Sequence, residues 1–318
     1  MYPLKLLPAF KDYIWGGTKL KTDFNKFSNL DKVAESWELS CHKDGESIIS
    51  NGDFKGMSLS KYIEQNGREI LGENCKKFDD FPILIKLIDA KDNLSVQVHP
   101  DNEYALKVEG EYGKTEMWYI VDCEEDASLI YGFKEKISKE EFLERIKNNT
   151  LLDVVNSVPV KKGDVFFIEA GTLHAIGKGI LIAEIQQNSN TTYRVYDYGR
   201  LGNDGKPRAL HVEKAAEVTN LFPAKPHPAG EKIDCGGHEE SLLASCDYFT
   251  VKSVEVKTIA KFDADKKSFH SILVLDGYVK LNYDGKEMKI SKGDSIFIPA
   301  GMGEYSIVGA CKFILTTV

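Results

Sequence analysis

Two histidines, a glutamate and a glutamine carry the strongest chemical signal in this sequence. Residues 93–100, NLSVQVHP, alternate apolar and polar side chains, which puts Gln97 and His99 on one face of a strand. Glu116 lies in the next β-type segment, and His174 follows a third one just beyond a glycine turn. Two imidazoles and a carboxylate, with an optional amide oxygen from Gln97, form a shell that suits Zn²⁺, Fe²⁺ or Mn²⁺. The sequence thus predicts a metal centre without selecting its metal.

Lys114 belongs to the same pattern because it precedes Glu116 by two residues, which places both side chains on one face of the strand. It would enter the same cavity and there either pair with the carboxylate or contact a substrate. Taken alone, the polar face of residues 94–99 would equally suit a half-exposed strand. The second imidazole and the carboxylate from two further segments favour the metal centre.

Short β-type runs dominate the chain and must position these side chains. Most are bounded by Gly, Pro, Asn or Asp, as in antiparallel sandwiches and barrels. Helical patterns are fewer, and the clearest is 139–148, where Ser138 and Glu141 form a candidate capping box. Weaker candidates cover 59–71 and 212–221. The sequence predicts a mainly β fold with a few helices in its N-terminal part.

A repeated pattern divides the chain into two parts. Residues 163–176, GDVFFIEAGTLHAI, match 293–306, GDSIFIPAGMGEYS, at their Gly-Asp turn, strand and Ala-Gly turn. We therefore expect two small antiparallel β-barrels, or jelly rolls, of common design. A proline-rich stretch predicts a connector between them. The expected domains are a metal-binding domain over 1–225, the connector over 226–239 and a second barrel over 240–318.

The second copy differs from the first at the positions of the expected ligands. Glu304 stands where the first copy has His174, and His270 occupies a place comparable to that of Glu116. No motif like QVH precedes them. We expect the C-terminal barrel to hold no metal.

Length and composition exclude several classes of protein. The chain has 318 residues, a formal net charge of −8 and no long basic run, which disfavours a nucleic-acid partner. Its six widely spaced cysteines suit reduced thiols in a cytosolic protein. No window approaches the roughly 20 apolar residues that span a bilayer, so no membrane partner is expected. We expect a cytoplasmic monomer or homodimer with a small-molecule substrate.

Four motifs follow one another along the chain, namely QVHP at 97–100, GKTEMWYI at 113–120, AGTLHAIGKG at 170–179 and EIQQNSNTTYRVYDYGR at 184–200. Together with IWGG at 14–17 and ESWELS at 35–40, they resemble the type I mannose-6-phosphate isomerases in the shorter form common in bacteria. The resemblance covers essentially the whole chain. It implies a double-cupin fold, one Zn²⁺ per chain and interconversion of mannose 6-phosphate with fructose 6-phosphate. The ligands it implies are Gln97, His99, Glu116 and His174.

The resemblance also implies roles for residues around the metal. Arg194 matches an active-site arginine that would stabilise an enediolate or bind the substrate phosphate; a solvated edge charge is the alternative. Ser95 and Lys86 match phosphate-binding positions, and Lys86 interrupts the apolar FPILIKLI, where an ammonium without an anion is costly. An exposed edge strand would explain Lys86 equally. Glu184 matches a glutamate that is either the general base or a carboxylate orienting a ligand histidine.

The implied reaction explains why such groups are needed together. Aldose–ketose isomerisation removes a proton next to a carbonyl and returns one to the neighbouring carbon through an enediolate. A Lewis acid or fixed cation stabilises the negative charge, and a base moves the proton; Lys114, Arg194 and Glu184 are the expected catalytic groups. Two other functions would use the same residues. One is an Fe²⁺-dependent cupin oxygenase, and the other is a sugar-phosphate-binding cupin without catalysis.

Overall fold

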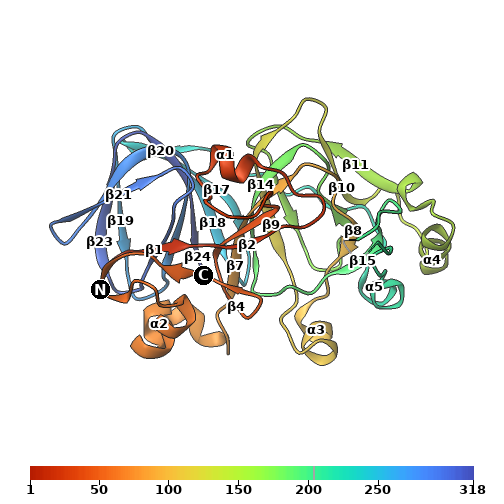
Figure 1. Cartoon of the computed structure of the whole chain (residues 1–318), viewed down its shortest axis with the longest axis horizontal. Coiled ribbons are helices and arrows are strands. Elements are labelled where there is room, and N and C mark those ends of the chain that lie inside the picture. The colour runs from red at the N-terminus through yellow and green to blue at the C-terminus, as the bar shows by residue number, and fades with distance from the viewer. Residues whose placement is uncertain (203–204) are drawn as a thin grey trace.

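The computed structural model describes residues 1–202 and 205–318, and it consists mainly of β-strands with a few helices (Figure 1). Within these residues every strand pair is antiparallel. The prediction of a mainly β fold is therefore confirmed. The strand order leaves open edges in each sheet over the described residues, so closure into two barrels stays a prediction.

Two sheets and a short ribbon form the N-terminal half. The six-stranded sheet runs in the order β12 (Val165–Ile168), β9 (Glu116–Cys123), β14 (Ile180–Gln187), β7 (Ile83–Ala90), β3 (Glu35–Leu39) and β2 (Ala9–Lys11). The five-stranded sheet runs β11 (Val155–Pro159), β10 (Ser128–Phe133), β13 (His174–Ala175), β8 (Val96–Val98) and β15 (Tyr193–Tyr196). The ribbon pairs β4 (Cys41–His42) with β5 (Gly45–Glu46).

One larger sheet forms the C-terminal half and also takes in the start of the chain. Its main path is β16 (Ile233–Asp234), β17 (His238–Ser245), β18 (Thr250–Val256), β24 (Cys311–Thr317), β20 (His270–Tyr283), β22 (Ser295–Ile298), β1 (Leu4–Leu7) and β6 (Ile48–Ile49). Off this path lie β19 (Ile259–Ala264), β21 (Lys286–Ser291) and β23 (Gly303–Val308). Because β1 pairs with β22, the first strand lies on the C-terminal half (Figure 1). The expected boundaries at 226–239 stay a prediction, to which the structure adds this crossover.

The three helices expected from the sequence are present as α2 (Leu59–Asn66), α4 (Lys139–Lys147) and α5 (Val212–Val218), and the structure adds α1 (Lys19–Asp23) and α3 (Asn102–Val108), which the sequence did not predict. There are also 3₁₀ turns at Gly52–Phe54, Arg68–Leu71, Glu73–Lys77 and Leu151–Asp153. Ser138 caps α4 by accepting a hydrogen bond of 3.1 Å from the Glu141 N–H. The pattern at 59–71 is interrupted at Gly67, whose φ of 85° ends α2 before the next 3₁₀ turn.

The repeat predicted from the sequence recurs in three dimensions. Strands β12 and β22 occupy matching positions, and each follows a turn closed by an aspartate. Asp164 Oδ2 accepts a hydrogen bond of 2.9 Å from Lys161 N, and Asp294 Oδ2 accepts one of 2.8 Å from Ser291 N. The turn glycines Gly163 and Gly293 have φ values of 94° and 88°, which a side chain would strain. The shared motif is thus preserved for its backbone geometry.

Three apolar cores pack against the N-terminal sheets, and the first of them also joins these sheets to the C-terminal half. The outer face of the six-stranded sheet packs against the C-terminal sheet through residues such as Ile85, Met117 and Phe297. A second core, which includes Trp118 and Tyr131, lies between the six- and five-stranded sheets. A third packs the outer face of the five-stranded sheet against α4 and α5. The space between the two N-terminal sheets is where their polar side chains meet.

Candidate metal centre

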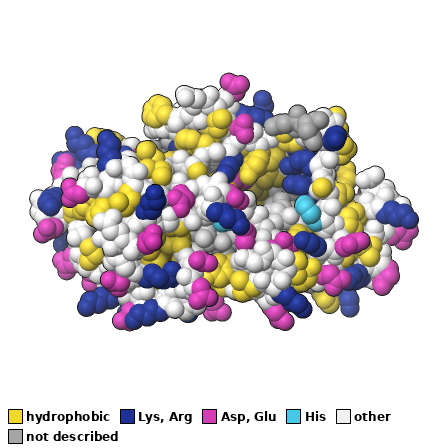
Figure 2. All heavy atoms as spheres, turned by 60° about the horizontal axis from the view of Figure 1, so that its bottom comes forward, with side chains coloured by type: hydrophobic (Ala, Val, Ile, Leu, Met, Phe, Trp, Pro, Cys, Tyr) yellow, Lys and Arg dark blue, Asp and Glu magenta, His cyan; other side chains and the backbone are white. Residues whose placement is uncertain are grey.

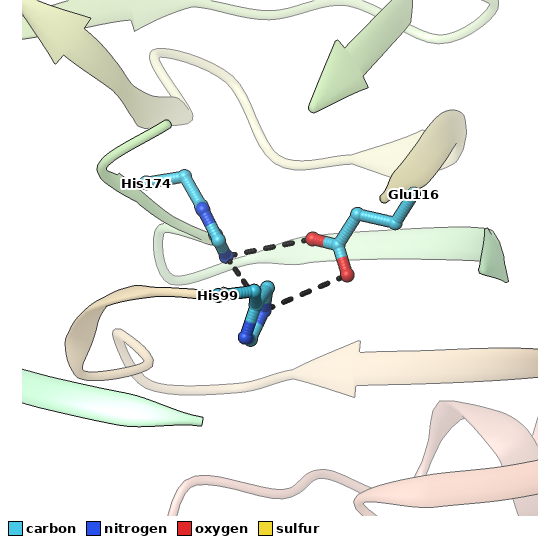
Figure 3. A group of neighbouring side chains, drawn as sticks. All are labelled: His99, Glu116 and His174. Atoms are coloured by element: carbon cyan, nitrogen blue, oxygen red, sulfur yellow. Dashed lines mark hydrogen bonds and ion pairs between the residues drawn. The ribbon is translucent and has the colours of Figure 1, made fainter. Parts of the chain in front are cut away.

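His99, Glu116 and His174 point toward one another, as Figure 3 shows; His99 follows the end of β8, and the other two lie on β9 and β13. Their closest ligand atoms all lie within 4.8 Å of one another. The Nε2 atoms of His99 and His174 are 3.2 Å apart, and the Glu116 carboxylate lies 3.7 Å and 3.4 Å from them. All three residues are buried, at 1% exposure or less. The predicted set of two imidazoles and a carboxylate is therefore brought together.

Strand alternation places these ligands as the sequence predicts. Val96 and Val98 of β8 are fully buried in the core beneath α4 and α5, while Gln97 and His99 face the space between the sheets. His174 on β13 lies directly opposite Gln97. Glu116 begins β9 in the facing sheet. The half-exposed alternative for this strand is wrong, because His99 is only 1% exposed.

Both histidines are held by backbone carbonyls at their other ring nitrogen. His99 Nδ1 lies 2.9 Å from the Thr191 carbonyl oxygen, and His174 Nδ1 lies 2.8 Å from that of Thr172. Because a carbonyl oxygen only accepts hydrogen bonds, each Nδ1 carries the proton, and each Nε2 presents a lone pair. Two lone pairs face each other across 3.2 Å. The Lys114 ammonium lies 3.2 Å from His99 Nε2, and a cation bound by both nitrogens would also satisfy the lone pair of His174.

The charge states of the group also suit a metal. Burial lowers the pKa of His174 to about 4 and that of His99 well below its usual value, so both rings are neutral near pH 7. Neither oxygen of Glu116 accepts a hydrogen bond from the residues that the structure describes. Burial, together with the Glu184 carboxylate, raises the pKa of Glu116 to about 7. A buried carboxylate needs a cation beside it. The Lys114 ammonium supplies one at 2.9 Å, and the donor set of two neutral imidazoles and a carboxylate also fits a divalent ion.

Gln97 lies at the edge of the group. One of its amide atoms is 3.4 Å from His174 Nε2, and its side chain is partly exposed. Since amide oxygen and nitrogen exchange places by a flip, the oxygen can face the metal position. Its role as a fourth ligand stays a prediction.

Lys114 contacts the same group, as the sequence predicts. Its Nζ lies 2.9 Å from Glu116 Oε2, 3.2 Å from His99 Nε2 and 3.7 Å from Glu184 Oε1. Its side chain is buried. The ammonium therefore stands between the proposed ligands and the Glu184 carboxylate.

Lys86 and Glu184 pair directly across β7 and β14, and both are buried. Lys86 Nζ lies 3.3 Å from Glu184 Oε1 and 3.6 Å from Glu35 Oε2. Burial alone would lower the pKa of Lys86, but Glu35 and Glu184 hold it above its usual value. The exposed-edge alternative for Lys86 is therefore wrong. Its contact with a phosphate stays a prediction, and the structure adds two carboxylate partners.

Arg194 shares a row with the metal centre, because it lies opposite Gln97 across β8 and β15. Its Nε donates a hydrogen bond of 3.2 Å to Ser95 Oγ, and Nη1 donates one of 3.0 Å to the Ala209 carbonyl. Arg194 is partly exposed, whereas Ser95 is buried. The structure thus brings together the expected phosphate residue Ser95 and the expected catalytic arginine.

Two further arginines lie near Arg194 and were not assigned a role from the sequence. Arg208 makes a two-point contact of 2.5 Å and 2.7 Å with the Asp197 carboxylate, and Arg200 contacts its Oδ1 at 2.5 Å. Burial, and then the charge of Arg208, lower the pKa of Arg194. Two guanidinium groups therefore share the Asp197 carboxylate. With Arg194 nearby, three arginines face one acidic group, so a net positive charge lies beside the site. Only the run RVYDYGR hinted at this cluster.

The chain is similar to family models and to individual proteins of known function. Residues 3–126 match the model of the type I phosphomannose isomerase catalytic domain, and residues 238–318 match that of the mannose-6-phosphate isomerase cupin domain. A mannose-6-phosphate isomerase of Bacillus subtilis is 39% identical over 321 residues, covering 99% of this chain and 98% of the relative. The chain belongs to the mannose-6-phosphate isomerase family.

Other members of this family agree with that assignment. A mannose-6-phosphate isomerase of Streptococcus mutans is 38% identical over 98% of this chain and 97% of its own. The crystal structure of the mannose 6-phosphate isomerase from Bacillus subtilis superposes with a TM-score of 0.94 and 36% identity over 100% of both chains. The expectation of an enzyme, and specifically of an isomerase of this family, is confirmed.

The C-terminal half of this family member has different side chains where the sequence repeat would place counterparts of the metal-centre residues. His270 Nδ1 lies 2.8 Å from the Tyr305 hydroxyl, whereas Glu304 is exposed at the neighbouring position of β23. In the part of the chain that the structure describes, the only group of three or more candidate ligands is the one formed by His99, Glu116 and His174. No helix there is long and apolar enough to cross a membrane.

Charges of both signs are interspersed on the face of the molecule shown in Figure 2, and no single-sign field covers it. This pattern accords with the acidic net charge of −8. It leaves local cations, such as the arginines beside the metal centre, to attract an anionic substrate.

Proposed function

We propose that this protein interconverts mannose 6-phosphate and fructose 6-phosphate at one Zn²⁺ ion held by His99, Glu116 and His174. The observation that carries the proposal is the convergence of these three buried side chains in a chain whose full-length relatives are mannose-6-phosphate isomerases. Gln97 is the proposed fourth ligand. A divalent ion there would supply Lewis acidity at the reacting oxygens.

The chain's own residues provide the remaining chemistry. Substrate reaches the centre from the side of Gln97 and Arg194, because these are the partly exposed members of the site while the other ligands are buried. Lys114 carries a fixed positive charge beside the ligands and stabilises negative charge that develops on the substrate oxygens during enediolate formation. Its contacts with Glu116 and Glu184 keep this ammonium in place.

We assign Glu184 as the general base that moves the proton between the two carbons. The alternative, that it orients a ligand histidine, has little support, because carbonyls already occupy both Nδ1 atoms. One oxygen, Oε2, accepts a hydrogen bond of 2.9 Å from Trp118 Nε1, while Oε1 accepts none from the described residues. Burial alone would raise the pKa of Glu184, but Lys114 and Lys86 hold it below the usual carboxyl value, so the group is ionised near pH 7.

The substrate phosphate is assigned to Arg194 and Ser95. A guanidinium can contact a phosphate at two points, and Arg208 and Arg200 add positive charge at the same place. Lys86 contributes less to this binding, since two carboxylates already compensate its ammonium. The proposed cytoplasmic location accords with a phosphorylated sugar as substrate.

The two other candidate functions lead to different experimental results. The same donor set would accept Fe²⁺ in an oxygenase, and a binder would keep the pocket without turnover. Purified, zinc-supplied protein should convert mannose 6-phosphate to fructose 6-phosphate in a coupled assay, and His174→Ala should abolish turnover. His270→Ala, a histidine outside the site, is the matched control and should retain full activity. Oxygen consumption with Fe²⁺, or phosphate-sugar binding without turnover in the metal-loaded protein, would refute the isomerase.

A further inference from the structure

Four side chains form a row across the six-stranded sheet beneath the metal centre. Trp37 of β3 lies opposite Lys86 of β7, Lys86 lies opposite Glu184 of β14, and Glu184 lies opposite Trp118 of β9. Neighbours of this kind have Cβ atoms about 5 Å apart and contact one another directly. All four are buried. A lysine–glutamate pair is thus enclosed between two indoles.

Glu35, two residues before Trp37, adds a second carboxylate to this row. Trp37 Nε1 donates a hydrogen bond of 2.7 Å to Glu35 Oε2, just as Trp118 Nε1 donates one of 2.9 Å to Glu184 Oε2. Lys86 Nζ stands between the two carboxylates, 3.6 Å from Glu35 and 3.3 Å from Glu184. The arrangement is nearly symmetric, with one ammonium between two carboxylates that are each held by an indole N–H.

The effect of losing Glu35 follows from the charges around the Lys86 ammonium. A buried ammonium is stable only with compensating anions. With Glu35 present, Lys86 is shared between two carboxylates. Without it, Lys86 has one close anion left, Glu184, and would pair with it fully. The Glu184 oxygen needed to take up a substrate proton, which already lies 3.3 Å from Lys86 Nζ, would then be held more tightly by that ammonium.

We propose that Glu35 is a positioning residue for the isomerase reaction, because it holds the Lys86 ammonium and so leaves Glu184 Oε1 available as the base. The inference rests on the proposed role of Glu184. Glu35 itself contacts no metal ligand in the described structure, and it acts through Lys86. Trp37 supports it by fixing the Glu35 carboxylate on the side of Lys86.

The chain offers a matched control on the same strand. Glu38 of β3 is also fully buried and also pairs with a lysine, Lys26, at 2.7 Å, but it lies toward the C-terminal half, where the Ser295 hydroxyl donates to its carbonyl oxygen. Glu35→Gln and Glu38→Gln each remove one buried charge and keep the side-chain size. A purely structural role for Glu35 predicts similar behaviour of the two variants.

Glu35→Gln should lower kcat by about 10²-fold, the scale of a misplaced catalytic group, with KM and bound metal changed less than threefold. Glu38→Gln should lower the melting temperature while kcat stays within threefold of the parent value. Trp37→Phe, which removes the indole N–H together with part of the buried ring, should lower kcat in the same direction by a smaller factor. It also serves as the test if Glu35→Gln does not fold. Unchanged kcat in Glu35→Gln, or in Trp37→Phe if that variant must stand in, would overturn the proposal.

A double variant separates action through Lys86 from a direct effect. In a Lys86→Met background, Glu35→Gln should change kcat by less than threefold, because the ammonium that it positions is gone. An equally large loss in both backgrounds would refute the proposed route. Glu184→Gln, measured in parallel, tests the underlying assignment. If Glu184→Gln is active, the proposed base is wrong; if it is inactive while Glu35→Gln is active, only the positioning role fails.

Discussion

Arg194 lies directly opposite Gln97, which in turn lies directly opposite His174, across three neighbouring strands. One row of cross-strand partners therefore runs from a buried metal ligand to a partly exposed arginine that contacts Ser95. This geometry separates two tasks along a single line. In the proposed function the buried end would hold the metal, and the exposed end would bind the substrate.

Arg194→Ala should reduce kcat far more than it reduces metal content. Loss of one preorganised donor to a developing charge costs about 10²–10³ in kcat. Among the described residues the Arg194 side chain donates to Ser95 and to the Ala209 carbonyl, and neither is a proposed metal ligand. Steady-state kinetics and metal analysis of the same sample measure both effects. Arg145→Ala, which removes a surface arginine of α4 paired with Glu141, is the control. A change below threefold would make Arg194 a solvated charge, and loss of metal would make it structural.

His270 should make the stability of the protein depend on pH. Burial lowers its pKa to about 4, whereas an unfolded histidine titrates near pH 6.5. Between these values the unfolded chain binds a proton that the folded chain does not, so stability is complete above about pH 6.5 and falls as the pH drops toward 4. The loss amounts to roughly 1.4 kcal/mol per unit at most.

Chemical denaturation of metal-free protein from pH 7 to pH 4 measures this effect. His270→Phe should flatten the pH dependence of the free energy of unfolding relative to the parent chain. His227→Gln, an exposed histidine in the connector, should leave the dependence as it was. Parallel curves for His270→Phe and the parent would contradict the assignment.

The alternating segment 94–99 shows how far sequence patterns determined this site. The period of two placed Gln97 and His99 on the inner face correctly, because one side of β8 packs against α4 and α5 and leaves no choice of register. Lys114 and Glu116 followed for the same reason. The capping box of Ser138 and Glu141 located α4, and the repeated Gly-Asp motif located the two aspartate turns.

Contacts between segments far apart in the sequence could not be predicted from such local patterns. Glu35 lies 51 positions before Lys86, its partner, and nothing in the spacing of ESWELS indicates the pairing across β3 and β7. For Asp197 the sequence left a surface charge or a structural pair open, and only the structure shows that it is 7% exposed and pairs with two arginines. The pairing of β1 with β22 joins opposite ends of the chain. Each of these contacts forms only once the strands have assembled into sheets.

Cutting the chain in the connector near Pro228 should yield an N-terminal fragment that is less soluble and less stable than the whole protein. The outer face of its six-stranded sheet, including Ile85, Leu87 and Met117, packs against the C-terminal sheet in one apolar core. The fragment would expose that face and leave β1 without β22. Solubility and thermal unfolding of the fragment beside the intact chain measure the effect. A fragment as soluble and as stable as the full chain would contradict this account of the shared core.

The most direct test of the central claim is a titration of chelator-treated protein with Zn²⁺, in which bound metal and isomerisation of mannose 6-phosphate are measured on the same samples. Turnover should rise in proportion to bound metal and stop rising at one ion per chain. His174→Ala should lose both metal and turnover, while Glu304→Ala should match the parent chain in both. Full turnover without metal, or a second tightly bound ion that disappears in Glu304→Ala, would contradict a single catalytic centre at His99, Glu116 and His174.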